Sequence, residues 1–229
     1  MSDQEGKDNS GIIPIGRRDL AKRSENLVRR GLDALLVQRE RILRFPDDRS
    51  VGRIFLESVP RDPEKVIKCD ARGSIRVPYG YEAHLEISGV TDLSFLTEFQ
   101  PDDLFRVDCW HIGERYATKG MAHIGTLKGL KELNLAGSQI MDFDLVNLRG
   151  MKDLKQLNLY QCYLITDAGL VHLKEMKAME GLYLWNIQIT DAGLVHLKEM
   201  KSLKSLILGG NQVTDAGKRY LKSFLPPCV

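Results

Sequence analysis

The chain has 229 residues, of which 43% are apolar and 28% charged, so it can hold one or two domains with a sizeable core. Its formal net charge of +2 excludes a strong overall attraction to nucleic acid or to an anionic membrane. The segment from Arg17 to Arg44 is richer in Lys and Arg than the rest, which indicates either a solvated basic face or a surface that meets a partner.

Targeting and redox signals are absent from the sequence. Its four cysteines, Cys69, Cys109, Cys162 and Cys228, lie far apart without a CxxC pair, so neither a zinc site nor a disulfide framework is predicted. The first residues, MSDQEGKDNSGIIPIG, lack the apolar core of a signal peptide, and no stretch is apolar enough to span a bilayer. We therefore expect a cytoplasmic protein in a reducing compartment, without a membrane partner.

The N-terminal third is predicted to contain a tail, a helix and a cap. Residues 1–16 are polar and are expected to be a disordered tail. Over residues 17–45, apolar residues recur at spacings of three, four and seven, which predicts an amphipathic helix. Its apolar side, with Leu27, Leu32, Leu35 and Leu36, is expected to cover the edge of the following strands, and the alternative is that it docks on a partner.

Residues 46–100 are predicted to form an N-terminal cap that grades into an irregular first repeat around Leu85 and Ile87. The segments VGRIFLES, GSIRVPYG and EAHLEIS alternate apolar and polar residues over short stretches, separated by PRDPEK and PYG. This alternation is typical of β-strands, and a stacked repeat structure needs a non-repeating end that seals its core.

Residues 101–229 contain an internal repeat. The segment ITDAGLVHLKEMK occurs unchanged at residues 165–177 and 189–201. Each repeat unit begins with a strand-like core, and the four cores are LKELNL, LKQLNL, MEGLYL and LKSLIL. LFRVDC at residues 104–109 is a weaker copy of this core. The central leucines Leu133, Leu157, Leu182 and Leu206 are 24, 25 and 24 residues apart, so stacked copies are expected to place them in one buried row.

Each unit is predicted to be a strand, a turn and a helix. After the strand core, Thr166 and Asp167 give a helix N-cap signal, and Leu170, Leu173 and Met176 follow with helical spacing. One such unit cannot bury its apolar strand face and helix stripe alone, whereas stacked units share a continuous core.

The units resemble the leucine-rich repeat superfamily, whose pattern LxxLxLxxN/C is matched by LKQLNLYQC and LKSLILGGN, with Cys162 and Asn211 at the polar turn position. ITDAGL resembles the cysteine-containing subclass of F-box adaptors and of many bacterial repeat proteins, which favours a bacterial source. The resemblance covers residues 101–229 strongly and 75–100 weakly. It implies an α/β fold, a right-handed β-α solenoid with a parallel concave sheet and convex helices.

Two departures from the repeat pattern have structural consequences. Ser138 and Ile187 take the polar turn position in the other units, and the Ile187 side chain cannot form its hydrogen bonds. That turn is therefore expected to be looser or completed by neighbouring residues. The segment NLYQCYLIT has one residue more than its sister units, so a local bulge is expected there.

No catalytic, metal or cofactor site is predicted. The sequence lacks GxxxxGK[ST], GxGxxG, HExxH and GxSxG. His123, His172 and His196 take equivalent helix positions, which are too far apart to share one zinc ion, so we interpret them as surface residues. Cys109 and His111 would share one side of a regular strand, but Cys109 takes an inward position and is expected to be a buried thiol.

The strands instead predict a binding surface on the concave sheet. Side chains beside the core leucines project from that face, because strand side chains alternate. Tyr160, Tyr183 and Trp185 are expected to touch there, with Ile207 one strand further. The predicted partner-binding residues are Trp110, Tyr160, Tyr183, Trp185 and Ile207 as apolar anchors, with Asp108, Asn134 and Asn158 setting the register through hydrogen bonds. The alternative is that these aromatic rings only shield the strand backbone.

The sequence therefore predicts a non-enzymatic module that binds a protein or peptide, with no cofactor and no small-molecule substrate. Nucleic acid is not expected, because this face has few basic residues. The alternative is a substrate-recognition adaptor subunit of an enzyme complex, as in F-box ubiquitin-ligase adaptors. The segment RRDLAKRSENLVRRGLDALL lacks the early Leu-Pro of an F-box, which counts against the adaptor.

Overall fold

The computed structural model describes residues 40–88, 92–111 and 113–226. The predicted tail and most of the predicted amphipathic helix, including Leu27, Leu32, Leu35 and Leu36, lie outside the described residues. The prediction that the helix extends to residue 45 is wrong, because Arg41–Arg44 form strand β1. Leu43 is buried and Ile42 exposed, a two-residue period, and β1 pairs antiparallel with β4 (Ser74–Val77). The pairing with β4, thirty residues away, fixes this conformation, and a local pattern could not reveal it.

The cap consists of antiparallel strands, as expected for the alternating segments. β2 (Gly52–Ser58) pairs antiparallel with β5 (Tyr81–Ile87) on one side and with β3 (Val66–Asp70) on the other. β3 was not among the predicted strands, and it follows a short 3-10 helix at Pro63–Lys65. β3 is an edge strand whose inward residues, Ile67 and Cys69, are only partly buried.

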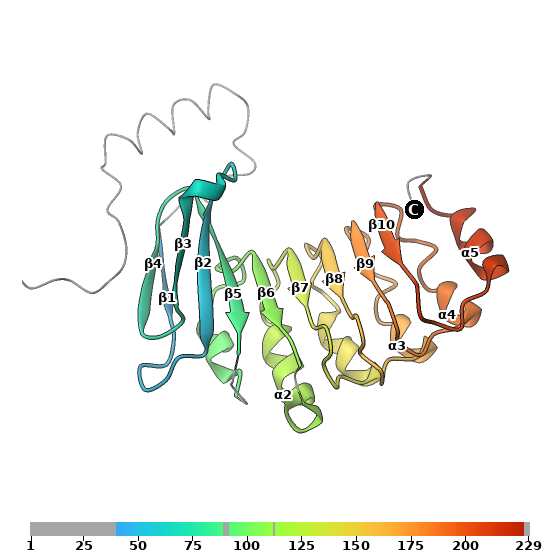
Figure 1. Cartoon of the computed structure of the whole chain (residues 1–229), viewed down its shortest axis with the longest axis horizontal. Coiled ribbons are helices and arrows are strands. Elements are labelled where there is room, and N and C mark those ends of the chain that lie inside the picture. The colour runs from blue at the N-terminus through green and yellow to red at the C-terminus, as the bar shows by residue number, and fades with distance from the viewer. Residues whose placement is uncertain (1–39, 89–91, 112, 227–229) are drawn as a thin grey trace, which may run out of the picture.

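The main sheet has eight strands in the order β10-β9-β8-β7-β6-β5-β2-β3. From β5 onward, neighbouring strands pair in parallel. Figure 1 shows these strands side by side from the N-terminal cap to the C-terminal end, with the helices on one side of the sheet. The repeat strands are β6 (Arg106–Cys109), β7 (Glu132–Asn134), β8 (Gln156–Asn158), β9 (Gly181–Tyr183) and β10 (Ser205–Ile207). This topology is the predicted leucine-rich repeat solenoid.

The row of central leucines is formed in the predicted register. Leu133, Leu157, Leu182 and Leu206 are direct cross-strand neighbours. Leu157 and Leu182 are fully buried and Leu133 is 2% exposed, but Leu206 is only partly buried. The prediction was therefore wrong for Leu206, because β10 is the last strand of the described sheet and no described strand pairs with its outer side.

The helices of the duplicated segments are much shorter than predicted. α3 (Asp167–Leu170) and α4 (Asp191–Leu194) have four residues each, and turns follow them. In the first copy the amides of His172, Leu173 and Met176 donate to carbonyls three residues earlier. This is 3-10 geometry, whose period of three residues keeps Leu170, Leu173 and Met176 on one buried side. The other elements on this side are η2 (Ser94–Glu98), α2 (Glu114–Ile124), η3 (Asp142–Leu148) and α5 (Asp215–Lys222).

An aspartate of each unit joins it to the next, in contacts that we call the Asp–Thr ladder. Asp167 accepts hydrogen bonds from the Thr190 amide at 2.8 Å and from the Thr190 hydroxyl at 2.6 Å. The same pairs form between Asp142 and Thr166 and between Asp191 and Thr214. The threonines also cap the following helices, as predicted. The TD of each TDAG motif thus works both within and between units.

Glycine in the same motif makes room for the ladder. A Cβ atom on Gly193 would lie 2.3 Å from Asp167 Oδ1, and one on Gly169 would lie 2.4 Å from Asp142 Oδ1. Gly217 meets Asp191 in the same way. The TDAG motif therefore forms a contact between neighbouring units and also starts a helix.

Side chains at the polar turn position form further hydrogen bonds between neighbouring units. Ser138 Oγ donates to the Cys109 carbonyl at 3.2 Å, and Cys162 Sγ donates to the Leu135 carbonyl at 3.2 Å. Ile187 lacks a polar side chain, but its amide donates to Asn211 Oδ1 at 2.9 Å. The neighbouring unit thus completes the Ile187 turn. The extra residue of NLYQCYLIT lies in a turn at residues 163–164, and β8 keeps its regular pairing.

Candidate functional site: the concave sheet

The parallel register arranges the side chains of the concave face in rows that cross the strands. One row passes through the first residues of β6 to β10, and a second passes through their third residues. The first row is Arg106, Glu132, Gln156, Gly181 and Ser205, and the second row is Asp108, Asn134, Asn158, Tyr183 and Ile207. The first row changes from charged groups on β6 and β7 through an amide on β8 to the small residues Gly181 and Ser205. The second row changes from a carboxylate on β6 through amides on β7 and β8 to an aromatic and an aliphatic side chain on β9 and β10.

A third row lies just beyond the strands and contains exposed aromatic side chains. Trp110 is 51% exposed, Tyr160 40% and Trp185 44%, while Ile207 at the end of the second row is 39% exposed. Tyr183 is half-buried. The side chains predicted to be anchors are therefore accessible on one face, although most large apolar side chains of the described chain are buried.

The predicted contact among Tyr160, Tyr183 and Trp185 does not take the form of ring pairing. The ring pairs found in the described chain lie elsewhere, among Phe45, Phe95 and Phe99, between His84 and Phe105, and between Tyr220 and Phe224. Trp185 instead lies over the backbone of the following strand, because a Cβ atom on Gly209 would be 2.1 Å from Trp185 Cζ3. Its ring thus points toward Gly209, away from Tyr160.

A left-handed residue ends each concave strand segment. His111, Gln161 and Asn186 have φ of 57°, 57° and 55°, and glycines take the same place in the other units. The chain therefore turns away directly after Trp110, Tyr160 and Trp185, which leaves these side chains at a bend. Cys109 is buried, as predicted, and it does not share a strand face with His111, because β6 ends at Cys109 and His111 turns over Gly137.

Asn134 and Asn158 each use the side-chain oxygen, but not the side-chain nitrogen, in a hydrogen bond within the described chain. Asn134 Oδ1 accepts from the Ala136 amide at 3.1 Å, and Asn158 Oδ1 accepts from the Tyr160 amide at 2.9 Å. Each hydrogen bond to the amide two residues later holds the asparagine side chain in place and occupies its Oδ1 acceptor. Within the described residues, no hydrogen bond uses either Nδ2 group, so both are available as donors to a ligand.

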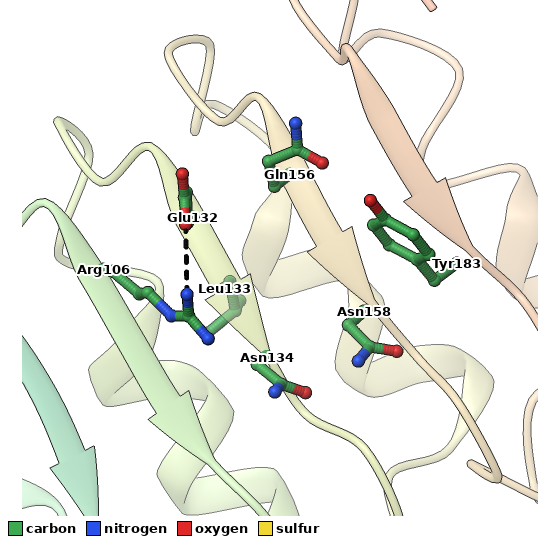
Figure 2. Close-up of a pocket in the computed structure, with 7 residues that line it drawn as sticks. All are labelled: Arg106, Glu132, Leu133, Asn134, Gln156, Asn158 and Tyr183. Atoms are coloured by element: carbon green, nitrogen blue, oxygen red, sulfur yellow. Dashed lines mark ion pairs between the residues drawn. The ribbon is translucent and has the colours of Figure 1, made fainter. Parts of the chain in front are cut away.

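A hollow of about 250 Å³ lies between these strands, and we call it the central hollow. Figure 2 shows its polar side chains, with Arg106 directed at Glu132 and the Tyr183 hydroxyl directed toward Gln156. Gln156 Oε1 is buried and has no hydrogen-bond donor among the described residues. A Cβ atom on Gly181 would lie 1.8 Å from this oxygen, so only glycine leaves room for it. The lining residues are Arg106, Glu132, Leu133, Asn134, Gln156, Asn158 and Tyr183.

Ion pairs surround the charged end of the hollow. Arg106 binds Asp108 through two hydrogen bonds, at 2.8 and 3.0 Å. Its Nη1 is 3.5 Å from Glu132 Oε2, and Arg61 Nη2 is 3.9 Å from Glu132 Oε1. Asp108 is therefore the main ion-pair partner of Arg106. Glu132 has only two long contacts.

His84 lies next to this network and is held neutral. It is stacked on Phe105 with a centroid separation of 5.4 Å, and its Nδ1 is 3.1 Å from Glu57 Oε1. Burial lowers the pKa of His84 from 6.5 to about 4, although the neighbouring Glu57 carboxylate acts in the opposite direction. Desolvation outweighs the partner because the His84 side chain is 7% exposed.

The described cysteines and histidines provide no reactive centre. Burial raises the pKa of the Cys109 and Cys162 thiols to about 12, and Cys69 also forms no disulfide. Among the described side chains, no group of three or more His, Cys, Asp or Glu residues is placed to hold a metal ion. Each helix in the described ranges is too short or too polar to cross a membrane.

Sequence reasoning placed Arg106, Glu132 and Gln156 on the concave face but did not select them as site residues. It did not find the neighbours Arg61 and His84, which belong to the cap. The signal for His84 is the alternation in EAHLEI, which puts the residues between its apolar positions on the concave side. The contact of Arg61 with Glu132 bridges 71 positions and has no local signal.

No protein-family profile matches the chain, and no curated protein matches it. Similar solved structures include two internalins of Listeria monocytogenes, with TM-scores of 0.44 each and identities of 17% and 23%. A leucine-rich repeat protein of Leptospira interrogans matches with a TM-score of 0.45 and 20% identity. These matches cover 62%, 63% and 63% of this chain but only 45%, 59% and 36% of the respective neighbours. The sheet topology and the repeat register of the chain itself identify its fold as a leucine-rich repeat solenoid.

Proposed function

We propose that the chain is a non-enzymatic module that binds a protein or peptide on its concave face. The observation that carries the proposal is the exposure of Trp110, Tyr160, Trp185 and Ile207 along a sheet whose other face is the buried core. Large accessible aromatic side chains beside small residues supply contact area at low entropic cost, as in protein-binding hot spots.

In this proposal the second row orients the partner. Asn134 and Asn158 offer Nδ2 donors in fixed positions, and Asp108 is held by Arg106. Tyr183 stands between these polar groups and Ile207, so it contacts both the polar and the apolar part of a ligand. The free thiols of the described cysteines suit a reducing cytoplasm, which we propose as the location.

The test begins with selection of peptides from a random displayed library against the intact chain. Trp185→Ala and Tyr183→Ala should each weaken the selected peptides by about thirtyfold, equivalent to about 2 kcal/mol, because they remove central anchors. His172→Ala and His196→Ala, in the segments on the opposite side of the sheet, serve as controls and should change affinity less than about twofold. Calorimetry gives the affinities.

Thermal unfolding followed by circular dichroism shows whether each variant keeps its fold. If the folded aromatic variants bind the selected peptides as tightly as the parent chain does, the concave face is not the binding surface. The proposed function then fails, whatever the sequence of the peptides.

A further inference from the structure

We infer that the ligand of the concave face is an extended peptide with a Lys or Arg side chain in the central hollow and an apolar side chain about four residues away, on Tyr183 and Ile207. The inference rests on the proposed function and adds the chemistry of the partner. It follows from the charge of the hollow, from its unpaired acceptor and from the spacing of the strands.

The charged end of the sheet has an excess of carboxylates. The described groups around the hollow include four acids and three arginines, while His84 is neutral. The acids are Glu57, Glu82, Asp108 and Glu132, and the arginines are Arg41, Arg61 and Arg106. Asp108 is matched by Arg106 and Glu57 by Arg61, and Arg41 acts on Glu82, so Glu132 remains in excess. A cation is therefore favoured at this end, and an anion is repelled.

The state of Glu82 is consistent with this excess. Burial raises its pKa, and the carboxylates of Glu132 and Glu57 act in the same direction. The opposing effects of Arg61 and Arg41 are too small to reverse the shift. A ligand cation would relieve this repulsion.

The central hollow presents acceptors that match a guanidinium or ammonium group. Glu132 makes only the 3.5 Å and 3.9 Å contacts with Arg106 and Arg61, and Gln156 Oε1 has no donor within the described chain. A guanidinium carries five N–H donors and an ammonium three, whereas a carboxylate carries none. A cationic side chain thus satisfies the buried Gln156 acceptor and the excess carboxylate together.

The strand spacing sets the distance between the two anchors. Neighbouring strands are about 4.8 Å apart, so three steps from Glu132 on β7 to Ile207 on β10 span roughly 14 Å. An extended chain advances about 3.3 Å per residue and covers this distance in about four residues. The Asn134 and Asn158 Nδ2 donors line the hollow and suit the free backbone carbonyls of an extended peptide. A helical ligand has already used most of its carbonyls.

The test uses short peptides of defined sequence, Ac-GRGSGLG-amide and the reversed Ac-GLGSGRG-amide, titrated into the full chain labelled with ¹⁵N. The side-chain amide signals of Gln156, Asn134 and Asn158 report contact with the hollow. One of the two orders should shift these signals and bind about tenfold more tightly than the same peptide with citrulline, which keeps the shape of arginine but has no charge.

Two variants separate charge from fold. Glu132→Gln should reduce the affinity for the arginine peptide to that for the citrulline peptide, and Gln156→Met should weaken binding of the arginine peptide. His196→Ala is the control and should change neither. Dispersed amide spectra that match the parent away from the hollow establish that each variant is folded.

Equal binding of the arginine and citrulline peptides on the concave face overturns this inference and leaves the proposed function standing. Absence of shifts at the three amides at about 10 mM peptide, far above a useful affinity, also overturns it. The proposed function fails separately, when library-selected peptides bind without dependence on Tyr183 and Trp185.

Discussion

Replacement of Leu182 by Ala tests the register of the whole solenoid, because Leu182 is fully buried and lies between Leu157 and Leu206 in the central row. The change removes three carbon atoms, which corresponds to about 2.4 kcal/mol at about 0.8 kcal/mol per buried CH₂. The cavity left in a packed interior raises the expected loss to about 3–5 kcal/mol. The matched control Leu206→Ala makes the same change where the side chain is only partly buried, and should cost about 1–2 kcal/mol.

Urea unfolding at fixed pH, followed by far-ultraviolet circular dichroism, measures both losses. Leu182→Ala should also lower Tm by roughly 6–20 °C, at about 2–4 °C per kcal/mol for a chain of this size. The decisive quantity is the difference between the two variants, since the deleted atoms are the same. Equal losses for Leu182→Ala and Leu206→Ala, or a Leu182→Ala chain that melts with the parent, would refute the register and the open C-terminal end of the row.

Three further variants test other features of the fold. Asp167→Ala removes two hydrogen bonds to Thr190 and should cost about 2–3 kcal/mol in urea unfolding, whereas Asp215→Ala, whose side chain is 84% exposed, should cost less than about 1 kcal/mol; equal costs would contradict the ladder. His84 has a folded pKa of about 4, below its ordinary 6.5, so its neutral form favours folding above pH 6.5 and this contribution, on the order of 3 kcal/mol, is lost as pH falls toward 4. His84→Phe should flatten stability between pH 4 and 6.5, and an unchanged pH profile would show that His84 is not held neutral. If residues 1–39 cover the edge strand of the cap, their deletion should cause aggregation in light-scattering measurements, and an equally soluble truncation would instead favour a docking role for that segment.

The repeat units could be predicted because each unit carries its own pattern. Leu133, Leu157 and Leu182 lie in the cores of segments with the same alternation, and nearly equal spacing brings them into register. The Thr190 cap could be predicted for the same reason, since it satisfies amides only two residues away. Local rules suffice where both partners of an interaction belong to one unit.

The length of the helices was overestimated from a correct pattern. Leu170, Leu173 and Met176 are all buried, as the spacing indicated, but a period of three residues fits a 3-10 turn as well as one side of an α-helix. A sequence window cannot distinguish the two from apolar positions alone. The backbone hydrogen bonds, which run to residues three positions earlier, decided between them.

The sequence could predict which side chains lie on the concave face, but not their hydrogen-bond and ion-pair partners. Alternation along the strands placed Tyr183, Asn158 and Glu132 on the concave sheet, and their accessibility follows from that position. The unpaired Gln156 acceptor depends on the small residue opposite it, Gly181, which belongs to the next unit. The long Arg61–Glu132 contact joins the cap to the repeats and depends on how the cap packs.

The sequence by itself determined the period of the solenoid, the inward leucines and the outward side chains of each strand, because these depend on alternation within segments of a few residues. Only the tertiary structure decided that Asp167 binds Thr190 across units, that Arg41–Arg44 form a strand, and that carboxylates are in excess near Glu132. Each of these depends on groups from different parts of the chain coming within a few ångströms. Coulombic and hydrogen-bond energies change steeply over that distance, and sequence spacing alone does not specify it.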